Sequence, residues 1–312
     1  MATPSKTPVI VVLGGINMDL VSVSSRIPQA GETILGDSFF TAPGGKGANQ
    51  AVAAARLGAS VRMVGRIGND AFGRSLLDGM RSEGIDVSRI AEDEGVSSGI
   101  AMILLESGGA NRIIVIPGAN ALCGDEQYMA VVDALRGADA LMLQNEVDTG
   151  LSTAAARYAQ SAGVKVIWDP APAVDLPQDT LATADVWTPN QVEAEMLTGI
   201  AVDSQASAAE AARILLRIGA RAAVVKLGEL GACFATPTEE GFVPAFAVDA
   251  VDTTAAGDAF AAGLAVGLSE GTSLSDAVRF ASAAGALAVT KRGAQPAMPL
   301  RQEVDALLRR PS

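Results

Sequence analysis

Short apolar runs and longer amphipathic or alanine-rich segments alternate along most of the chain. The apolar runs predict buried strands at residues 9–13, 60–64, 140–143, 164–168, 186–188 and 222–226. The remaining segments predict helices at residues 51–57, 126–135, 151–162, 207–218, 256–269, 274–289 and 301–308. This alternation is typical of an α/β fold with a mostly parallel central sheet that is flanked by helices on both faces.

Two shorter β-like patterns interrupt this alternation. They lie at residues 20–23 with 38–41, and at residues 99–105 with 112–116 around a glycine-rich loop. Apolar runs on both sides of such a loop predict a hairpin. We expect the two excursions, at about residues 17–42 and 97–118, to pair into one small sheet that acts as a discontinuous β lid. No linker or repeat divides the chain, so residues 1–312 are predicted to form a single domain.

Composition excludes several classes of protein. With 49% hydrophobic and 19% charged residues, the 312-residue chain does not have the composition of a disordered protein. Aromatic residues make up only 4%, which gives no sign of a base-stacking surface for nucleic acid. The net charge of −12 opposes binding to nucleic acid and to anionic membranes. Attraction for an anionic nucleotide must therefore be local, from helix N-termini, a few lysines and a divalent cation.

The cysteine and histidine content restricts the chemistry further. Two cysteines, Cys123 and Cys233, cannot build a disulfide framework, and the chain contains no histidine. Zinc clusters of cysteine and histidine and Ser-His or Cys-His triads are therefore excluded, and any general base must be a carboxylate, a lysine or a tyrosine. The chain has no apolar run of 18 residues, and its first apolar run is too short for a signal sequence. We expect a soluble, cytoplasmic protein without a membrane partner.

One string has the residue types of an anion site, Asp252-Thr253-Thr254-Ala255-Ala256-Gly257-Asp258. Asp252, Thr253 or Thr254 can cap the helix that follows, and the small residues after them leave its first N–H groups accessible. A helix N-terminus of this kind can hold phosphates without a lysine. Asp258 lies in the first turn, where it could take the proton of an attacking hydroxyl. The alternative is an ordinary N-cap followed by a packing glycine.

Polar residues also follow several predicted strands. They are Asn17 and Asp19, Asn145 and Glu146, Asp169, and Asn190 with Glu193. Ligands of open α/β sheets bind beyond the carboxyl ends of the strands, so the repetition indicates a site at one edge. Asn190 and Glu193 stand three residues apart at a helix start and could hold the waters of a magnesium ion. The alternatives are ordinary turn residues at 17–19 and a capping box at 190–193.

A glycine-rich string precedes the predicted helix at 51–57, Gly44-Gly45-Lys46-Gly47-Ala48-Asn49-Gln50. It is not a nucleotide P-loop, because Phe40 occupies the position of the first glycine and Gly47 follows the lysine. The glycines allow a ligand to approach the backbone, and Lys46 and Asn49 offer donors, which fits a polyhydroxylated ligand. The alternative is a loop with a solvated lysine.

Together these two strings resemble the PfkB family of carbohydrate kinases, also called ribokinase-like, and within it most closely the ribokinases. The likeness covers nearly the whole chain. Further strings occur in the family's order and spacing: Gly15-Ile16-Asn17-Met18-Asp19, Asn190-x-x-Glu193, Leu227-Gly228 and Lys291-Arg292-Gly293-Ala294-Gln295-Pro296. The resemblance implies a ribokinase-like α/β fold and ATP-dependent phosphorylation of the 5-hydroxyl of D-ribose.

The resemblance also implies roles for individual residues. Asp258 would be the general base, and the backbone of Ala255, Ala256 and Gly257 would form the anion hole. The sugar would be held by Asn17, Asp19, Gly45, Lys46, Asn49, Glu146 and Asp258. The nucleotide would contact Asn190, Lys226, Gly228, Gly257 and Ser282. Asn190 and Glu193 would organise the waters of Mg²⁺, and an activating K⁺ would be held by Asp252, Thr254, Ala288, Lys291 and Gly293. Lid pairing would produce a homodimer.

Three positions depart from the family pattern. Ala297 stands where similar proteins often carry a serine of the cation site, Ser282 where a larger polar residue commonly flanks the adenine, and Lys226 where some relatives have threonine. Two other functions stay open. One is phosphorylation of another sugar or of a nucleoside, although Asn17 argues against deoxyribose, which lacks a hydroxyl for it. The other is sugar binding without catalysis, which the retained Asp258 disfavours.

Overall fold

The computed structural model describes residues 6–106, 108 and 111–310. Three residues of the glycine-rich loop expected at 107–111, namely Ser107, Gly109 and Ala110, lie outside this range. None of the helices in the described part is long and apolar enough to cross a membrane.

The main sheet has nine strands in the order β13-β12-β11-β10-β9-β8-β1-β4-β5. Neighbours pair in parallel from β11 to β5, whereas β12 and β13 are antiparallel additions at one edge. The strands are β1 (Val9–Leu13), β4 (Ser60–Gly68), β5 (Asp86–Asp93), β8 (Ala140–Leu143), β9 (Lys165–Trp168), β10 (Val186–Trp187), β11 (Ala223–Lys226), β12 (Gly231–Ala235) and β13 (Glu240–Pro244).

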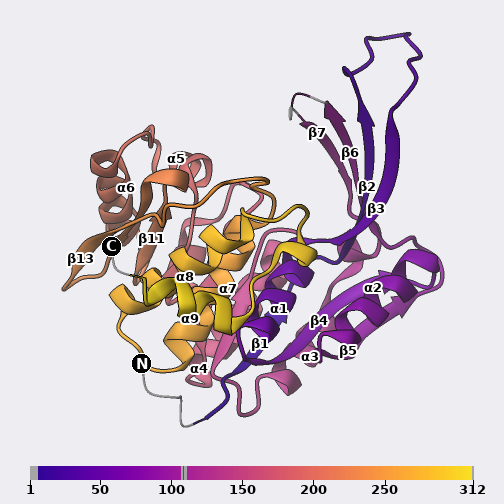
Figure 1. Cartoon of the computed structure of the whole chain (residues 1–312). Coiled ribbons are helices and arrows are strands. Elements are labelled where there is room, and N and C mark those ends of the chain that lie inside the picture. Colours follow the sequence, from indigo (N-terminus) through magenta and orange to yellow (C-terminus); the bar gives the residue numbers. More distant parts are fainter. Residues whose placement is uncertain (1–5, 107, 109–110, 311–312) are drawn as a thin grey trace.

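Helices cover both faces of this sheet, as predicted (Figure 1). One core lies under α1 (Lys46–Arg56), α2 (Ala71–Ser82), α7 (Ala256–Ser269), α8 (Leu274–Ala288) and α9 (Arg301–Leu308). The other lies under α3 (Asp125–Ala134), α4 (Thr149–Ser161), α5 (Gln191–Thr198) and α6 (Gln205–Arg217). Short 3₁₀ helices are η1 (Gly118–Leu122), η2 (Gln178–Thr183), η3 (Gly228–Leu230) and η4 (Gln295–Ala297).

Strand β1 shows why its sequence is apolar throughout. Ile10 and Val12 join the first core, and Val11 and Leu13 join the second, because successive side chains of a strand point to opposite faces. All four side chains are fully buried. A strand between two helix layers therefore has no solvent-facing side for polar residues.

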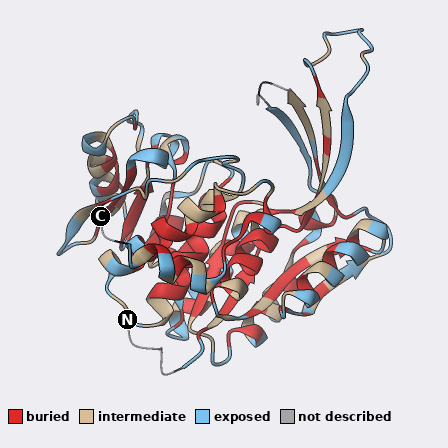
Figure 2. Cartoon of the chain, in the orientation of Figure 1, coloured by how far each residue is buried: buried red, intermediate tan, exposed pale blue. Residues whose placement is uncertain are grey.

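A second, four-stranded sheet stands away from this body (Figure 1). Its order is β3-β2-β6-β7, and its strands are β2 (Asn17–Ser24), β3 (Ser38–Gly44), β6 (Gly99–Glu106) and β7 (Asn111–Ile116). The two predicted β excursions thus pair with each other, through a parallel contact of β2 with β6. Its outer strands β3 and β7 are mostly exposed, whereas its central strands β2 and β6 are mainly buried or half-buried (Figure 2).

Some element boundaries were predicted wrongly. Helix α1 begins at Lys46 rather than at residue 51, so most of the glycine-rich string is helical. Strand β4 continues to Gly68, beyond the predicted end at residue 64. Strand β5 was not predicted at all, because its apolar residues at positions 87, 90 and 91 form neither a continuous apolar run nor a strict alternation.

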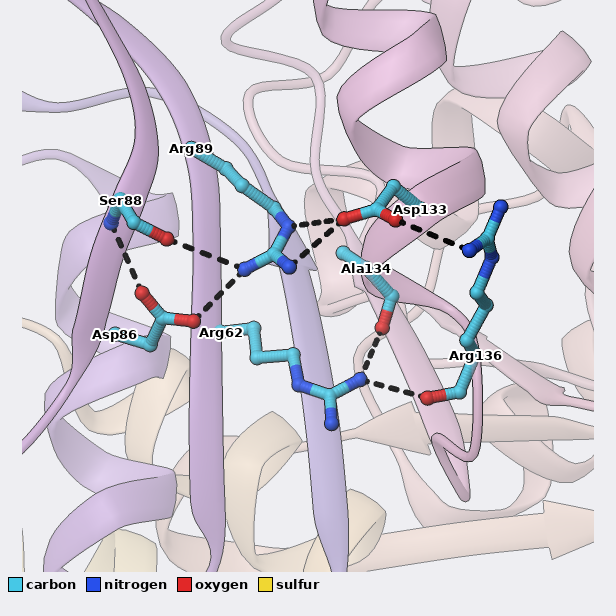
Figure 3. A network of polar contacts seen from close by, with 7 residues as sticks. All are labelled: Arg62, Asp86, Ser88, Arg89, Asp133, Ala134 and Arg136. Carbon is cyan, nitrogen blue, oxygen red and sulfur yellow. Dashed lines mark hydrogen bonds and ion pairs between the residues drawn. The ribbon is translucent and has the colours of Figure 1, made fainter.

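Charged side chains tie this edge strand to α3 (Figure 3). The guanidinium of Arg89 on β5 donates to Asp133 at 2.8 and 3.1 Å and to Asp86 at 2.8 Å. Arg62 on β4 donates to the carbonyl oxygens of Ala134 and Arg136, at the end of α3. Solvated ion pairs of this kind contribute at most about 1 kcal/mol each, so they fix the position of the edge more than they stabilise the fold.

Candidate active site

The site forms where the carboxyl ends of β1, β8 and β9 meet the first turns of α1 and α7. Side chains from these distant segments contact one another directly. Asn49 Nδ2 donates to Oδ2 of Asp258 at 3.0 Å, and the backbone N–H of Lys46 donates to Glu146 at 2.7 Å. The sequence separations are 209 and 100 residues. The edge that the polar residues indicated is therefore one connected site.

Asp258 is almost completely enclosed, with only 4% of its surface exposed. Its second oxygen, Oδ1, accepts a hydrogen bond from Gln50 Nε2 at 3.1 Å. Burial raises the pKa of Asp258, and the charge of Asp169 raises it further, whereas the ammonium of Lys46 and the two amide donors lower it. The carboxylate is thus buried, oriented and surrounded by groups that oppose one another.

Helix α7 begins in an unusual backbone conformation. Its N-cap is Ala255, a non-glycine residue with φ of 58°, and no side chain caps the helix. The expectation that Asp252, Thr253 or Thr254 caps it was wrong. Asp252 instead accepts from the backbone N–H and the hydroxyl of Thr254, and its other oxygen accepts from Gly293 at 2.8 Å.

Because no side chain caps α7, the N–H groups of its first turn have no side-chain acceptor. A helix start of this kind can bind an anion. The left-handed conformation of an alanine costs about 1–2 kcal/mol. Such local strain persists where the surrounding structure enforces it, and it is common at functional sites.

On the proposed sugar side, Asn17 is buried and held by Asn120, which was not predicted. Asn120 Nδ2 donates to Oδ1 of Asn17 at 2.8 Å and to the carbonyl of Ile16 at 3.1 Å, and its own oxygen accepts from the N–H of Ile16. This bond leaves the amide N–H₂ of Asn17 as the group that can be offered to a ligand. Gly45 has φ of 87°, and a side chain there would collide with the backbone of Asn17.

Two further acids of this side carry shifted pKa values. Burial and the nearby charge of Asp258 raise the pKa of Asp19 to about 6. Burial raises the pKa of Glu146 to about 7, although the ammonium and backbone N–H of Lys46 oppose the rise. Burial alone would lower the pKa of Lys46, but four carboxylates around it raise the pKa above its ordinary value.

On the other side of α7 lies a cavity of about 670 Å³. Its lining includes all five residues predicted for the nucleotide, Asn190, Lys226, Gly228, Gly257 and Ser282. Most of the remaining lining is small or apolar, from segments 245–250 and 285–289. The hydroxyl of Ser282 is buried and has no hydrogen-bond partner among the described residues.

Lys226 is the cation of this cavity that stands next to the start of α7. Its ammonium donates to Oδ1 of Asp169 at 2.7 Å, and both side chains are largely buried. A Cβ atom added to Gly257 would lie 3.4 Å from the Lys226 nitrogen. The positive charge therefore stands beside the first turn of α7, where a phosphate would lie.

Asn190 and Glu193 form a capping box at the start of α5, the alternative that the sequence left open. Asn190 Oδ1 accepts from the N–H of Glu193 at 2.9 Å, and Glu193 accepts from the N–H and from the side-chain amide of Asn190, both at 2.8 Å. Burial raises the pKa of Glu193, as does the charge of Asp169.

The residues predicted to hold K⁺ lie on two segments that bond to each other. The N–H groups of Val251 and Asp252 donate to the carbonyl of Val289, and Gly293 donates to Asp252. The ammonium of Lys291 turns away to pair with Glu303 at 2.9 Å. Within the described residues, no cluster of three or more histidine, cysteine, aspartate or glutamate side chains is arranged as a metal site.

The interactions that sequence reasoning missed are those of buried amides. Gln50 lies in a quoted string but received no role, and Gln144 and Asn120 were not singled out. A glutamine within the alanine-rich start of a helix was the available signal for Gln50, because a buried amide needs partners.

Comparison with known proteins places these observations in a family. Residues 8–301 match the model described as pfkB family carbohydrate kinase. The ribokinase of Bacillus subtilis is 39% identical over 96% of this chain and 99% of its own length. The deoxyribokinase of Salmonella typhi is 34% identical over 96% of this chain and 98% of its own length. A solved Arabidopsis thaliana ribokinase, complexed with ribose and ATP, has a TM-score of 0.91 and 32% identity, and the match covers 98% of this chain and 100% of that chain. The chain belongs to the pfkB family of carbohydrate kinases.

Proposed function

We propose that this enzyme transfers the γ-phosphoryl group of ATP to the 5-hydroxyl of D-ribose, giving ribose 5-phosphate and ADP. The observation that carries the proposal is the position of Asp258. Its buried carboxylate lies in the first turn of α7, and no side chain caps this helix. Asn49 and Gln50 hold the carboxylate in place, and the cavity of about 670 Å³ lies on the other side of the helix. Sequence identity with a ribokinase, and structural similarity to a ribokinase complexed with ribose and ATP, support the choice of the two substrates.

In the proposed reaction, Asp258 accepts the proton of the sugar's primary hydroxyl as that oxygen forms a bond to the γ-phosphorus. The bond between the γ-phosphorus and the bridging oxygen breaks, and ADP leaves with the electron pair. The N–H groups of the first turn of α7, at residues 255–257, would face the phosphoryl group as its charge shifts, and that of Ala256 would exchange its 3.3 Å bond to the carbonyl of Thr253 for one to the phosphate. Positioning and charge neutralisation dominate such transfers, so a chain without histidine suffices.

We assign the sugar to the cluster on one side of Asp258. Asn17, Asp19, Gly45, Lys46, Asn49 and Glu146 would hold its hydroxyls. The Oδ1 atom of Asn49 supports this assignment, because it is buried and has no partner among the described residues. The nucleotide would occupy the cavity on the other side, against Asn190, Lys226, Gly228, Gly257 and Ser282.

Two cations complete the proposal. Mg²⁺ bound to ATP neutralises phosphate charge, and Asn190 and Glu193 offer oxygen and nitrogen groups that can bond to its waters. K⁺ suits the oxygen atoms of Asp252 and Thr254 and the backbone carbonyls of Ala288, Lys291 and Gly293. Omitting Mg²⁺ should abolish turnover, and replacing K⁺ by a quaternary ammonium ion should lower it. Turnover that is independent of both cations would contradict these assignments.

We also propose a homodimer formed through the small sheet, in the cytoplasm. Its strands β3 and β7 expose large apolar side chains, among them Phe39, Ile113 and Ile114, which are 65%, 52% and 62% exposed. Exposed apolar strands of this kind are typical of an interface. Sedimentation of the wild type and of Ile114→Glu should give a dimer and a monomer. A wild-type monomer would contradict the dimer.

The test of the function is ADP release from ATP and Mg²⁺ with D-ribose, 2-deoxyribose, a ketohexose and inosine in potassium buffer. We expect the highest kcat/KM with ribose. If turnover occurs only with another sugar or with a nucleoside, the proposed mechanism stands and the proposed substrate is wrong. Deoxyribose is the alternative with direct support, from the similarity to a deoxyribokinase. Sugar binding without any turnover would overturn the proposal in favour of a binding protein.

A further inference from the structure

A continuous chain of buried hydrogen bonds joins the nucleotide cavity to the proposed base. Lys226, which lines the cavity, donates to Oδ1 of Asp169 at 2.7 Å. Gln50 Nε2 donates to Oδ2 of the same aspartate at 3.1 Å, and also to Oδ1 of Asp258 at 3.1 Å. One amide nitrogen therefore bridges two carboxylates, one on each side of the site.

The orientation of this bridging amide is fixed by a second glutamine. Gln144 Nε2 donates to Oε1 of Gln50 at 2.6 Å, so the Gln50 nitrogen must face the carboxylates. Asp169 is held in turn by the hydroxyl of Thr188 at 3.2 Å. Both glutamines are fully buried and do not line the cavity, so Gln50 cannot act by touching the nucleotide.

The chemistry of the position favours glutamine. The buried carboxylates of Asp169 and Asp258 both need hydrogen-bond donors. The neutral amide of glutamine supplies two N–H groups from one nitrogen and adds no charge. A glutamate would bring a third negative charge, and an apolar side chain would leave both acids with one donor fewer.

We propose that Gln50 is a positioning residue for the phosphoryl transfer, which holds Asp258 ionised and in place and links it to the Asp169–Lys226 pair at the nucleotide. This inference rests on the proposed role of Asp258 as the base. A movement of Lys226 toward a bound phosphate changes its bond to Asp169. Through the bridging amide of Gln50 this change reaches Asp258, the acid that receives the proton.

The charged groups that face Asp258 set the direction of the expected effect. Lys46 on α1 favours its ionised form, and Asp169 beyond β9 opposes it. Glu146 beyond β8 and Asp19 on β2 are also close enough to interact with it. The bonds from Asn49 and Gln50 stabilise the charge, so loss of one of them raises the pKa of Asp258.

The experiment is the pH profile of kcat for Gln50→Met, which keeps the length of the side chain and removes both bonds. We expect the acidic limb of the profile to move up by about one pH unit, so that kcat falls by up to about tenfold at pH values below the wild-type limb and stays near the wild-type value well above it. The KM values for ribose and ATP should stay within about threefold. The matched control is Ser152→Ala, a buried polar residue in the other core, which should leave the profile unchanged.

A second measurement tests the link to the nucleotide side. Lys226→Met should move the acidic limb in the wild-type background, and this movement should disappear in the Gln50→Met background. Its effect on the KM for ATP should remain in both. Equal movements of the limb in the two backgrounds would overturn the link.

Other outcomes decide the remaining points. A lower kcat with an unmoved acidic limb would show that Gln50 only supports the fold, and would overturn the proposal. If Gln50→Met does not fold, Gln144→Met decides, because it frees the bridging amide: a smaller upward movement supports the proposal, and none contradicts it. Failure of the proposed function is recognised separately: the wild type would then release no ADP with ribose, and failure of the proposed base alone would leave Asp258→Asn at the wild-type rate.

Discussion

The two sides of α7 solve different binding problems. On the sugar side, Asp19, Lys46, Glu146 and Asp258 are clustered and mostly buried, and their pKa values are shifted by burial and by one another. On the nucleotide side, a cavity of about 670 Å³ is lined mainly by small and apolar residues, with Lys226 and Glu229 as its charged members.

The difference follows from the proposed ligands. A neutral sugar offers only hydroxyls, so it must be selected by fixed charges and amides whose own partners are already in place. A nucleotide brings its own charge and a flat base, so backbone N–H groups and an apolar slot suffice. Substitutions on the sugar side should therefore act mostly on rate and stability, and those on the nucleotide side on ATP binding.

The largest effect is expected for Asp258→Asn. The amide keeps the shape and hydrogen-bonding reach of the side chain but cannot accept the hydroxyl proton, so kcat should fall about 10³-fold. Calorimetry should show ribose affinity within a few-fold of the wild type. The exposed Asp249→Asn is the control and should be fully active. A variant at position 258 with more than one tenth of the wild-type rate would remove Asp258 from the mechanism.

Asn120 offers the next test, because its side chain holds Asn17 and the backbone of Ile16 on the proposed sugar side. In Asn120→Asp the bonds to Asn17 and to the Ile16 carbonyl lose their donor. The Asn17 amide is then free to turn, and kcat/KM for ribose should fall about tenfold. Steady-state kinetics should show an unchanged KM for ATP. An equal rise in both KM values would mean that the substitution disturbs the whole site.

A third prediction uses the raised pKa of Glu146, which burial moves from 4.5 to about 7. In this pH range the folded protein holds a proton that the unfolded chain has released. The buried acid therefore destabilises the fold increasingly as the pH rises from 4.5 to about 7. Glu146→Gln removes this cost, and its unfolding free energy should exceed that of the wild type by on the order of 2 kcal/mol at pH 8.

Urea unfolding at pH 5 and pH 8 measures this difference. At pH 5 most of the gain should be absent. The matched control on the nucleotide side is Glu229→Gln, an exposed residue, which should change stability by less than about 0.5 kcal/mol at either pH. A gain for Glu146→Gln that is equal at both pH values would show that titration of this acid is not its cause.

The smallest effect is expected for Ser282→Ala. Ser282 lines the cavity, and its hydroxyl would contact the nucleotide through at most one neutral hydrogen bond, so its removal should raise the KM for ATP less than about threefold. Ser282→Leu, which fills part of the cavity, should raise that KM while the KM for ribose stays constant. A much larger loss for the alanine variant would show that this one hydroxyl contributes more to ATP binding than a single neutral hydrogen bond.

The fold was predictable where one physical rule dominates. Val9–Leu13 is apolar on both faces because helices cover both faces of its sheet, and that pattern was recognised from the sequence alone. Strand β5 was missed because the apolar residues of Asp86–Asp93, an edge strand, form neither a continuous run nor a strict alternation. The start of α1 was missed because glycines at residues 44–47 favour a loop, and the close approach of the neighbouring strand overrides that preference.

The sequence indicated several of the segments that the structure brings together around Asp258, but not the bonds between them. The string ending at Asp258 marked the helix start and the acid. The bonds from Gln50 to Asp258 and from Asn120 to Asn17 join residues that are 208 and 103 positions apart. No local pattern encodes such pairs. The cap of α7 was predicted wrongly for the same reason, because the backbone N–H of Gly293, 41 residues further along the chain, donates to Asp252.

The most direct test of the central claim is ³¹P nuclear magnetic resonance of the products formed from ATP and D-ribose. We predict one new phosphomonoester signal, split into a triplet by the two protons on C5, together with the signals of ADP. 5-Deoxyribose, which lacks the 5-hydroxyl, should give no such signal. A doublet, which would place the phosphate on a ring carbon with one proton, or no phosphomonoester at all, would contradict the account.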